Sequence, residues 1–280
     1  MITKEREIKA LITLLGDEDQ NIRNIAREKL LDFGEMASDY LRDVVHKDYE
    51  GRIRIEAWKI LEEIRLEKLT DEFRKLSQAK VFDLEEGAFL LAQFEYPNLD
   101  VQAYKQQIDE MAEEIHGRIF EIRDVRRMVH VINQYLFYEQ GFRGNVESYY
   151  DPQNSYINRV LDRKLGIPIS LSALYLFIAD RLDLPIFGVG LPGHFMLKFH
   201  CEWDEFYIDA FNYGQLLSKN DCVNFLKRMG YTYNESYFNI AKPRDILARM
   251  IRNLVLIYHQ KNQKNKVDVL ERFFSLIVNH

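Results

Sequence analysis

Two residues that could carry out acid–base chemistry, His194 and Asp209, lie 15 residues apart on consecutive predicted strands. An imidazole can take up and return a proton, and a carboxylate can orient the ring and stabilise its charged form. This spacing permits the two side chains to meet on one face of a sheet. We predict that they pair directly, either at a functional site or as a satisfied buried pair.

The nucleophile that would complete such a site is not evident. Thiol acyl-transfer enzymes place a cysteine at the N-terminus of a buried helix, where the helix dipole and the imidazole lower the pKa of the thiol. The matching segment, 166–170, reads Gly-Ile-Pro-Ile-Ser and contains no cysteine. Ser170 is its only hydroxyl, with Ser172 just beyond. Its position favours a helix cap over a nucleophile, which would need His194 within hydrogen-bond reach.

Three further polar residues, Asn154, Tyr156 and Asn158, could line a cleft, although their positions favour caps and turns. A metal site would have to draw on His194, His200, Cys201 and Asp209, and their spacing matches no standard zinc pattern. Cys201 falls in a predicted hairpin beside charged residues, which indicates an incidental thiol. We therefore expect neither a metal nor a cofactor.

The elements that must position these residues are mostly helical. Pro97, after Glu95-Tyr96, ends the helix predicted over 84–94. Asn154 or Ser155 is expected to cap the helix over 156–165. Helices are predicted over 84–94, 104–119, 123–139, 156–165, 170–182, a segment after 218, 245–260 and 267–278. Strands are predicted over 186–191, 195–200 and 205–211, with a hairpin at 200–205. The expected class is α+β, mostly α, with a small antiparallel sheet.

The first 80 residues contain an internal repeat. At a shift of 31 residues, four positions are identical: Ile22, Arg23, Ala26 and Leu30 match Ile53, Arg54, Ala57 and Leu61. Apolar residues follow helical spacing, and an acidic turn precedes the first copy. Paired helices with this pattern resemble HEAT repeats, of which two copies are legible. We expect a HEAT-like region over 1–80.

Four longer motifs point to a known family. They read EGAFLLAQFEYPNLD (86–100), YYDPQNSYINRVLDRKLGIPISLSALYL (149–176), GVGLPGHFMLKF (188–199) and YIDAFN (207–212). In this order they resemble the SirB-type transglutaminase-like proteins. The resemblance implies a transglutaminase-like (papain-like) core over 81–240, and it implies that His194 and Asp209 match the histidine and aspartate of the family site. The two helices predicted after the core form a C-terminal helical pair over 241–280, which we expect to pack on the core.

Composition limits the function classes. The 280 residues carry a formal net charge of −6, which argues against nonspecific binding to nucleic acid. The start shows no secretory signal, and no apolar run approaches the ~18 residues that a membrane span requires. With two cysteines, Cys201 and Cys222, the sequence predicts a reduced cytoplasmic protein without disulfides.

Two functional hypotheses follow. The absent cysteine favours a non-catalytic interaction or regulatory module that retains a His/Asp cleft and binds a protein or peptide. The alternative is a peptidase- or amidase-like acyl-transfer hydrolase in which Ser170 attacks a carbonyl, His194 moves the proton and Asp209 holds His194. The sequence leaves the oligomeric state open.

Overall fold

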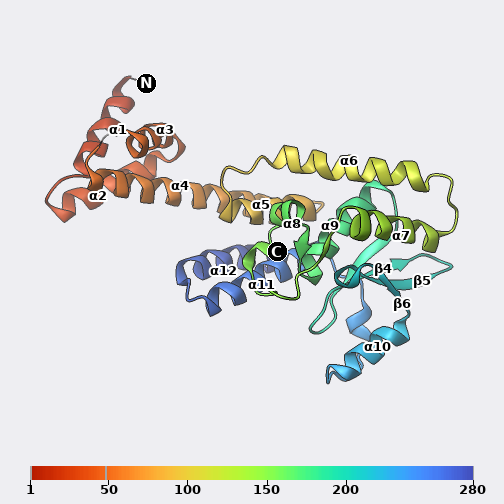
Figure 1. Ribbon diagram of the computed structural model, residues 1–280. Coiled ribbons are helices and arrows are strands. Elements are labelled where there is room, and N and C mark those ends of the chain that lie inside the picture. Colours follow the sequence, from red (N-terminus) through yellow and green to blue (C-terminus); the bar gives the residue numbers. More distant parts are fainter. Residues whose placement is uncertain (1, 48, 280) are drawn as a thin grey trace. The chain divides into compact units, whose positions relative to one another are not determined.

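The structure is a computed structural model that describes residues 2–47 and 49–279. The chain divides into two compact units, Met1–Glu72 and Phe73–His280 (Figure 1). Helix α4 (Gly51–Gln78) runs through the division point. Among the described residues, no helix combines the length and apolar character that a membrane crossing would need.

The first unit is built from α1 (Ile2–Leu14), α2 (Gln20–Phe33), α3 (Glu35–His46) and the first part of α4. The carboxylate of Asp19 accepts the N–H of Asn21 at 2.8 Å and so caps the start of α2. Gly34 takes a φ of 53° between α2 and α3. This left-handed conformation suits glycine and lets the chain reverse without an added linker.

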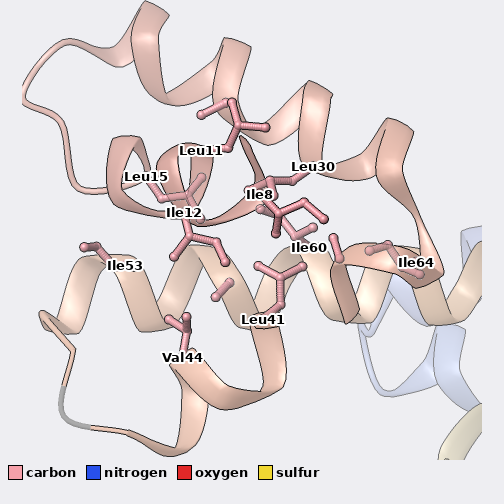
Figure 2. Close-up of a cluster of buried hydrophobic side chains, with 13 residues drawn as sticks. Ile8, Leu11, Ile12, Leu15, Leu30, Leu41, Val44, Ile53, Ile60 and Ile64 are labelled. Carbon is pink, nitrogen blue, oxygen red and sulfur yellow. The ribbon is translucent and has the colours of Figure 1, made fainter. Parts of the chain in front are cut away.

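One apolar cluster forms the core of this unit (Figure 2). Ala26 and Ala57, which match each other in the repeat, are both fully buried. The two aligned segments begin α2 and α4, so the helical periodicity read from the sequence is confirmed. Their assignment as HEAT-like repeats stays a prediction.

The second unit contains the remaining helices. Asp83, Asp100 and Asp124 each accept a backbone N–H at a helix start, as expected for N-cap residues. The α-helices are α5 (Leu84–Glu95), α6 (Val101–Ile119), α7 (Val125–Asn133), α8 (Ile157–Arg163), α9 (Pro168–Arg181), α10 (Lys219–Arg228), α11 (Pro243–Gln260) and α12 (Lys264–Val278). A π-helix, η1 (Gln134–Glu139), continues α7, and short 3-10 turns form η2 (Pro152–Asn154), η3 (Ala210–Asn212) and η4 (Glu235–Phe238).

A four-stranded antiparallel sheet lies in the same unit, in the order β3-β4-β5-β6. Its strands are β3 (Ile186–Val189), β4 (Met196–His200), β5 (Glu205–Asp209) and β6 (Gln215–Leu217). Helix α9 packs against β3 and β4, and α10 packs against β5 and β6. A separate parallel pair joins β1 (Arg143–Gly144) to β2 (Leu165–Gly166). The mostly helical architecture with a small antiparallel sheet is therefore confirmed.

Several boundaries differ from the sequence prediction. The helix expected over 123–139 is α-helical only to Asn133 and then becomes the π-helix η1. Strands β1, β2 and β6 were missed because two or three residues carry no readable periodicity. The expected cap of α8 was wrong: Tyr156 occupies that position without a side-chain bond, because the Asn154 side chain binds the carbonyls of Ser148 and Tyr149 instead.

The C-terminal pair α11 and α12 lies in the same compact unit as the sheet. Helix α11 packs against α5 and α9 as well as against α12. The division at Glu72 and Phe73 falls within α4, a few residues before the boundary expected at residue 80. The three-part division at residues 80 and 240 stays a prediction.

Candidate functional site

His194 and Asp209 form a direct pair. His194 lies in the turn just before β4, and Asp209 ends β5. The Nε2 atom of His194 is 3.0 Å from Oδ2 of Asp209, and the two side chains are only 8% and 5% exposed. The predicted pairing is thus confirmed, although His194 precedes its strand instead of lying on it.

The carboxylate of Asp209 accepts several hydrogen bonds. Oδ2 accepts the Asn212 amide at 2.8 Å, and Oδ1 accepts the backbone N–H groups of Phe211 and Asn212. Burial opposes ionisation of Asp209, but hydrogen bonds from His194 and Asn212 outweigh it and lower the pKa of the carboxyl below its ordinary value. An ionised carboxylate only accepts, so Nε2 of His194 carries the proton.

This assignment fixes the other nitrogen of the ring. In the neutral imidazole, Nδ1 then holds the lone pair. Within the described part of the chain, Nδ1 of His194 has no hydrogen-bond partner, and it is not among the fully buried unpartnered atoms. The pair therefore has one ring nitrogen that is not fully buried and has no hydrogen-bond partner among the described residues.

The turn that carries His194 is held by a distant arginine. Gly193 has a φ of 72°, and the His194 N–H donates to the Leu191 carbonyl at 3.2 Å. Nη2 of Arg249, on α11, donates to the carbonyl oxygens of both Leu191 and His194, at 3.0 and 2.7 Å. These bonds fix the backbone from which the imidazole projects.

The turn that follows Asp209 is also fixed from outside the sheet. Gly214 has a φ of 70°, and its N–H donates to the Asp209 carbonyl at 2.8 Å. Asn133, at the end of α7, donates to the Gly214 carbonyl at 2.6 Å and accepts the hydroxyl of Tyr175. A π-helical segment next to such a residue is typical of functional regions, and here it begins directly after Asn133.

Ser170 does not join the pair. It lies in the first turn of α9 and is fully buried. Its hydroxyl accepts the Ile167 N–H at 3.0 Å and donates to the Asn154 carbonyl at 2.6 Å. The hydroxyl thus satisfies backbone groups at the helix start, as a capping residue does. Neighbouring Ser172 is also fully buried, and its hydroxyl has no partner in the described structure.

The other candidates from the sequence lie in the interior. Asn154, Tyr156 and Asn158 are 0–2% exposed, so none can contact a ligand in an open cleft in this conformation. Asn154 organises the preceding loop, and Tyr156 shares a 2.9 Å hydrogen bond with the hydroxyl of Tyr258. The amide oxygen of Asn158 has no partner among the described residues.

Neither cysteine is part of α9: Cys201 follows β4, and Cys222 belongs to α10. Cys222 is buried on α10, where burial and then the charge of Asp221 raise the pKa of its thiol to about 12. Such a thiol stays protonated and unreactive at neutral pH. Within the described ranges, no group of three or more His, Cys, Asp or Glu side chains is arranged to hold a metal.

A cavity of about 490 Å³ opens beside Asp209, between the end of the sheet and α10. Its walls combine polar and apolar side chains: Met196, Asp209, Asn212, Gln215, Leu217, Asp221, Asn224, Phe225 and Arg228. The Phe225 ring also lies 5.4 Å from the His194 ring, which links the cavity to the pair. A volume of this size suits a small ligand or one or two side chains of a peptide.

Aromatic side chains surround the histidine. We call Tyr149, Tyr150, Phe211, Phe225 and Tyr231 the aromatic rim. The rings of Phe211 and His194 meet edge to face at 6.3 Å, and Tyr149 contacts both Phe211 and Tyr150. A Cβ placed on Gly193 would lie 3.7 Å from the Tyr231 ring. Tyr150 and Tyr231 are 62% and 40% exposed, so the rim offers apolar surface to a ligand.

Sequence reasoning missed Arg249, Asn133 and the cavity wall of α10. The contacts of Arg249 and Asn133 span 42 to 81 residues along the chain, so local sequence patterns do not predict them. The only available signal was a polar residue on an otherwise apolar helical face.

Comparison with known proteins gives the family. Residues 102–252 match the model of the transglutaminase-like superfamily, a span that contains His194, Asp209 and Arg249. A UPF0162 protein of Xylella fastidiosa (strain 9a5c) is 33% identical over 199 residues, which cover 69% of this chain and 71% of that protein. F-box only protein 21 of Homo sapiens is 34% identical over 146 residues, 49% of this chain and 23% of that protein.

No solved structure matches the chain. The finer assignment to the SirB-type group stays a prediction. The family match covers more than half of the sequence, and the paired histidine and aspartate lie inside it. The chain therefore belongs to the transglutaminase-like superfamily.

Proposed function

We propose that this chain is a non-catalytic interaction module that binds a protein or peptide segment in the cleft beside His194 and Asp209. The observation that carries the proposal is the state of Ser170. Its hydroxyl is fully buried and bonded to the backbone at Ile167 and Asn154, so the position of the missing thiol offers no free nucleophile.

The surroundings of the pair support ligand binding. The 490 Å³ cavity combines amides and a guanidinium with Met196, Leu217 and Phe225, and the aromatic rim adds exposed apolar surface. Concave sites that mix apolar walls with a few polar groups are typical of ligand pockets. The relative named F-box only protein 21 also points towards protein interactions.

The N-terminal helices, which we interpret as HEAT-like repeats, offer a second surface for a protein partner. Ile55 and Trp58 are three residues apart on α4, share one helix face, and are 57% and 58% exposed. Large apolar side chains grouped in this way are typical of interaction surfaces. We place the protein in the cytoplasm, as its sequence suggests.

A hydrolase remains the second candidate because the histidine and aspartate are paired and Nδ1 of His194 has no hydrogen-bond partner among the described residues. In that case Ser170 would have to break its bonds to Ile167 and Asn154 and approach His194. A hydrolytic assay separates the two candidates. The full chain is incubated with p-nitrophenyl acetate and with a panel of fluorogenic peptide amides.

We expect hydrolysis by the wild type, Ser170→Ala and His194→Ala proteins to equal the buffer rate. Hydrolysis that exceeds buffer and disappears in both variants would refute the proposal and establish the serine hydrolase.

Binding is tested by selecting phage-displayed peptides on the full chain. Asn224, on α10, lines the cavity and makes no hydrogen bond to the pair in the described structure, so Asn224→Trp fills the cavity and keeps the bond between His194 and Asp209. We expect this change to weaken the selected peptides at least about tenfold. Lys227→Trp is the matched control, because Lys227 is exposed on the same helix and does not line the cavity. Equal binding to both variants would place the peptide elsewhere.

A further inference from the structure

Arg249 differs from Arg181, another partly buried arginine of the same unit. Arg181 is held by Glu85 and Asp109 at 2.7 and 2.5 Å, and these carboxylates raise the pKa of its guanidinium. Arg249 pairs with no carboxylate in the described structure. Burial is the main cause that lowers the pKa of its guanidinium, and the like charge of Arg252 adds to it. Arg181 is thus neutralised by carboxylates, whereas Arg249 has no counter-ion among the described residues.

The guanidinium retains unused hydrogen-bond donors. An arginine side chain has five N–H donors. In Arg249, the two on Nη2 donate to the carbonyl oxygens of Leu191 and His194. The three N–H groups on Nε and Nη1 have no hydrogen-bond partner within the described ranges, and the guanidinium lies over the Phe195 ring at 5.4 Å from its centroid. Neither atom is among the fully buried unpartnered ones, so both retain access to solvent. A cation that keeps three accessible donors can accept an anionic ligand.

The position of these donors ties them to the candidate site. Arg249 binds the backbone oxygen of His194, and Tyr149 partly offsets the lowering of the pKa of its guanidinium. Tyr149 contacts Phe211, and Phe211 contacts the His194 ring. The turn that Arg249 holds therefore carries the imidazole that contacts this aromatic group, so a positive charge and aromatic surface lie close to the same turn.

We propose that Arg249 forms a carboxylate-binding subsite beside His194, which receives an acidic side chain or the terminal carboxylate of a bound peptide next to an aromatic or apolar residue. This inference rests on the proposed function, because it specifies the ligand of that same cleft. Arginine suits the role since its charge persists at all physiological pH values and its planar group matches a carboxylate. Tyr149 and Phe211 supply the apolar contact for the neighbouring residue.

The test compares one carboxylate with its neutral counterpart. N-acetyl-phenylalanine and N-acetyl-phenylalanine amide are titrated into the full chain labelled with ¹³C-histidine, and the His194 ring signal is identified by its loss in His194→Gln. We expect the acid to shift this signal saturably, with an affinity about tenfold higher than that of the amide. Equal affinities would overturn the carboxylate subsite and leave a binding cleft, so the two proposals fail separately. If neither probe shifts the His194 signal saturably, the carboxylate subsite is also overturned.

Two variants test whether Arg249 supplies the positive charge of the subsite. Arg249→Lys keeps a cation but presents its donors differently, and we expect the preference for the acid to fall below about threefold. Arg252→Lys is the matched control, because Arg252 is exposed on the same helix, does not line the cavity and likewise has no ion pair among the described residues. Loss of the preference in Arg252→Lys alone would refute the assignment to Arg249. Thermal melting of each variant verifies that it folds. If a variant does not fold, the comparison of the two probes on the wild-type protein still tests the subsite.

Discussion

Replacement of Ser170 by alanine tests whether this hydroxyl caps a helix or serves as a nucleophile. The change removes the acceptor of the Ile167 N–H and the donor to the Asn154 carbonyl. Both residues are at most 2% exposed, so water cannot readily replace the lost partner. A buried backbone group left unsatisfied costs about 1–3 kcal/mol, and we expect Ser170→Ala to lower the free energy of unfolding by about 2–4 kcal/mol.

Ser172→Ala is the matched control. Ser172 lies two residues further along α9 and is equally buried, but its hydroxyl has no partner in the described structure. Its removal eliminates an unsatisfied polar group and introduces the best helix former. We expect the free energy of unfolding to stay within about 1 kcal/mol of the wild type. The two changes delete the same atom from the same helix, so their difference isolates the capping bonds.

The assay is urea denaturation followed by circular dichroism, with calorimetry to separate the transitions of the two compact units. The loss in Ser170→Ala should appear only in the transition of the unit Phe73–His280. Amide hydrogen exchange at Ile167 should accelerate in Ser170→Ala and stay unchanged in Ser172→Ala. A Ser170→Ala protein within about 0.5 kcal/mol of the wild type would refute the capping argument, as would an equal loss in Ser172→Ala.

Two further predictions concern the residues that hold the pair in place. In Gly214→Ala the new Cβ would lie 2.3 Å from the Asn133 side chain, at a φ of 70°. The control is Gly230→Ala, where φ is 83° and nothing lies within 4 Å of the Cβ. The melting temperature should fall clearly further in Gly214→Ala than in this control, and equal melting temperatures would contradict the close approach. Because the folded-state pKa of Asp209 is lowered, its stabilising effect is complete above the ordinary value of 3.8 and is lost as pH falls through the lower pKa. Denaturation between about pH 5 and pH 2 should therefore show a weaker pH dependence in Asp209→Asn than in the wild type, and identical slopes would exclude the stabilisation of the Asp209 carboxylate.

Much of the architecture could be predicted because local patterns of apolar residues encode it. Apolar residues at helical spacing gave the positions of α5, α6, α9 and α11, and alternating segments gave β3, β4 and β5. The pairing of His194 with Asp209 could be predicted for the same reason, since a short hairpin brings neighbouring strands together. Strands β1, β2 and β6 could not, because each depends on a partner that sequence periodicity does not reveal.

The sequence by itself determined the helical and strand pattern, the histidine–aspartate pair and the absence of a cysteine at the start of α9. Only the tertiary structure decided what Ser170 does, because its hydroxyl is engaged by a carbonyl 16 residues earlier in the chain. Tertiary structure also decided the place of Arg249, which reaches His194 across 55 residues. Hydrogen bonds between distant residues depend on how helices and strands pack, and packing is a property of the folded chain that local sequence patterns do not encode.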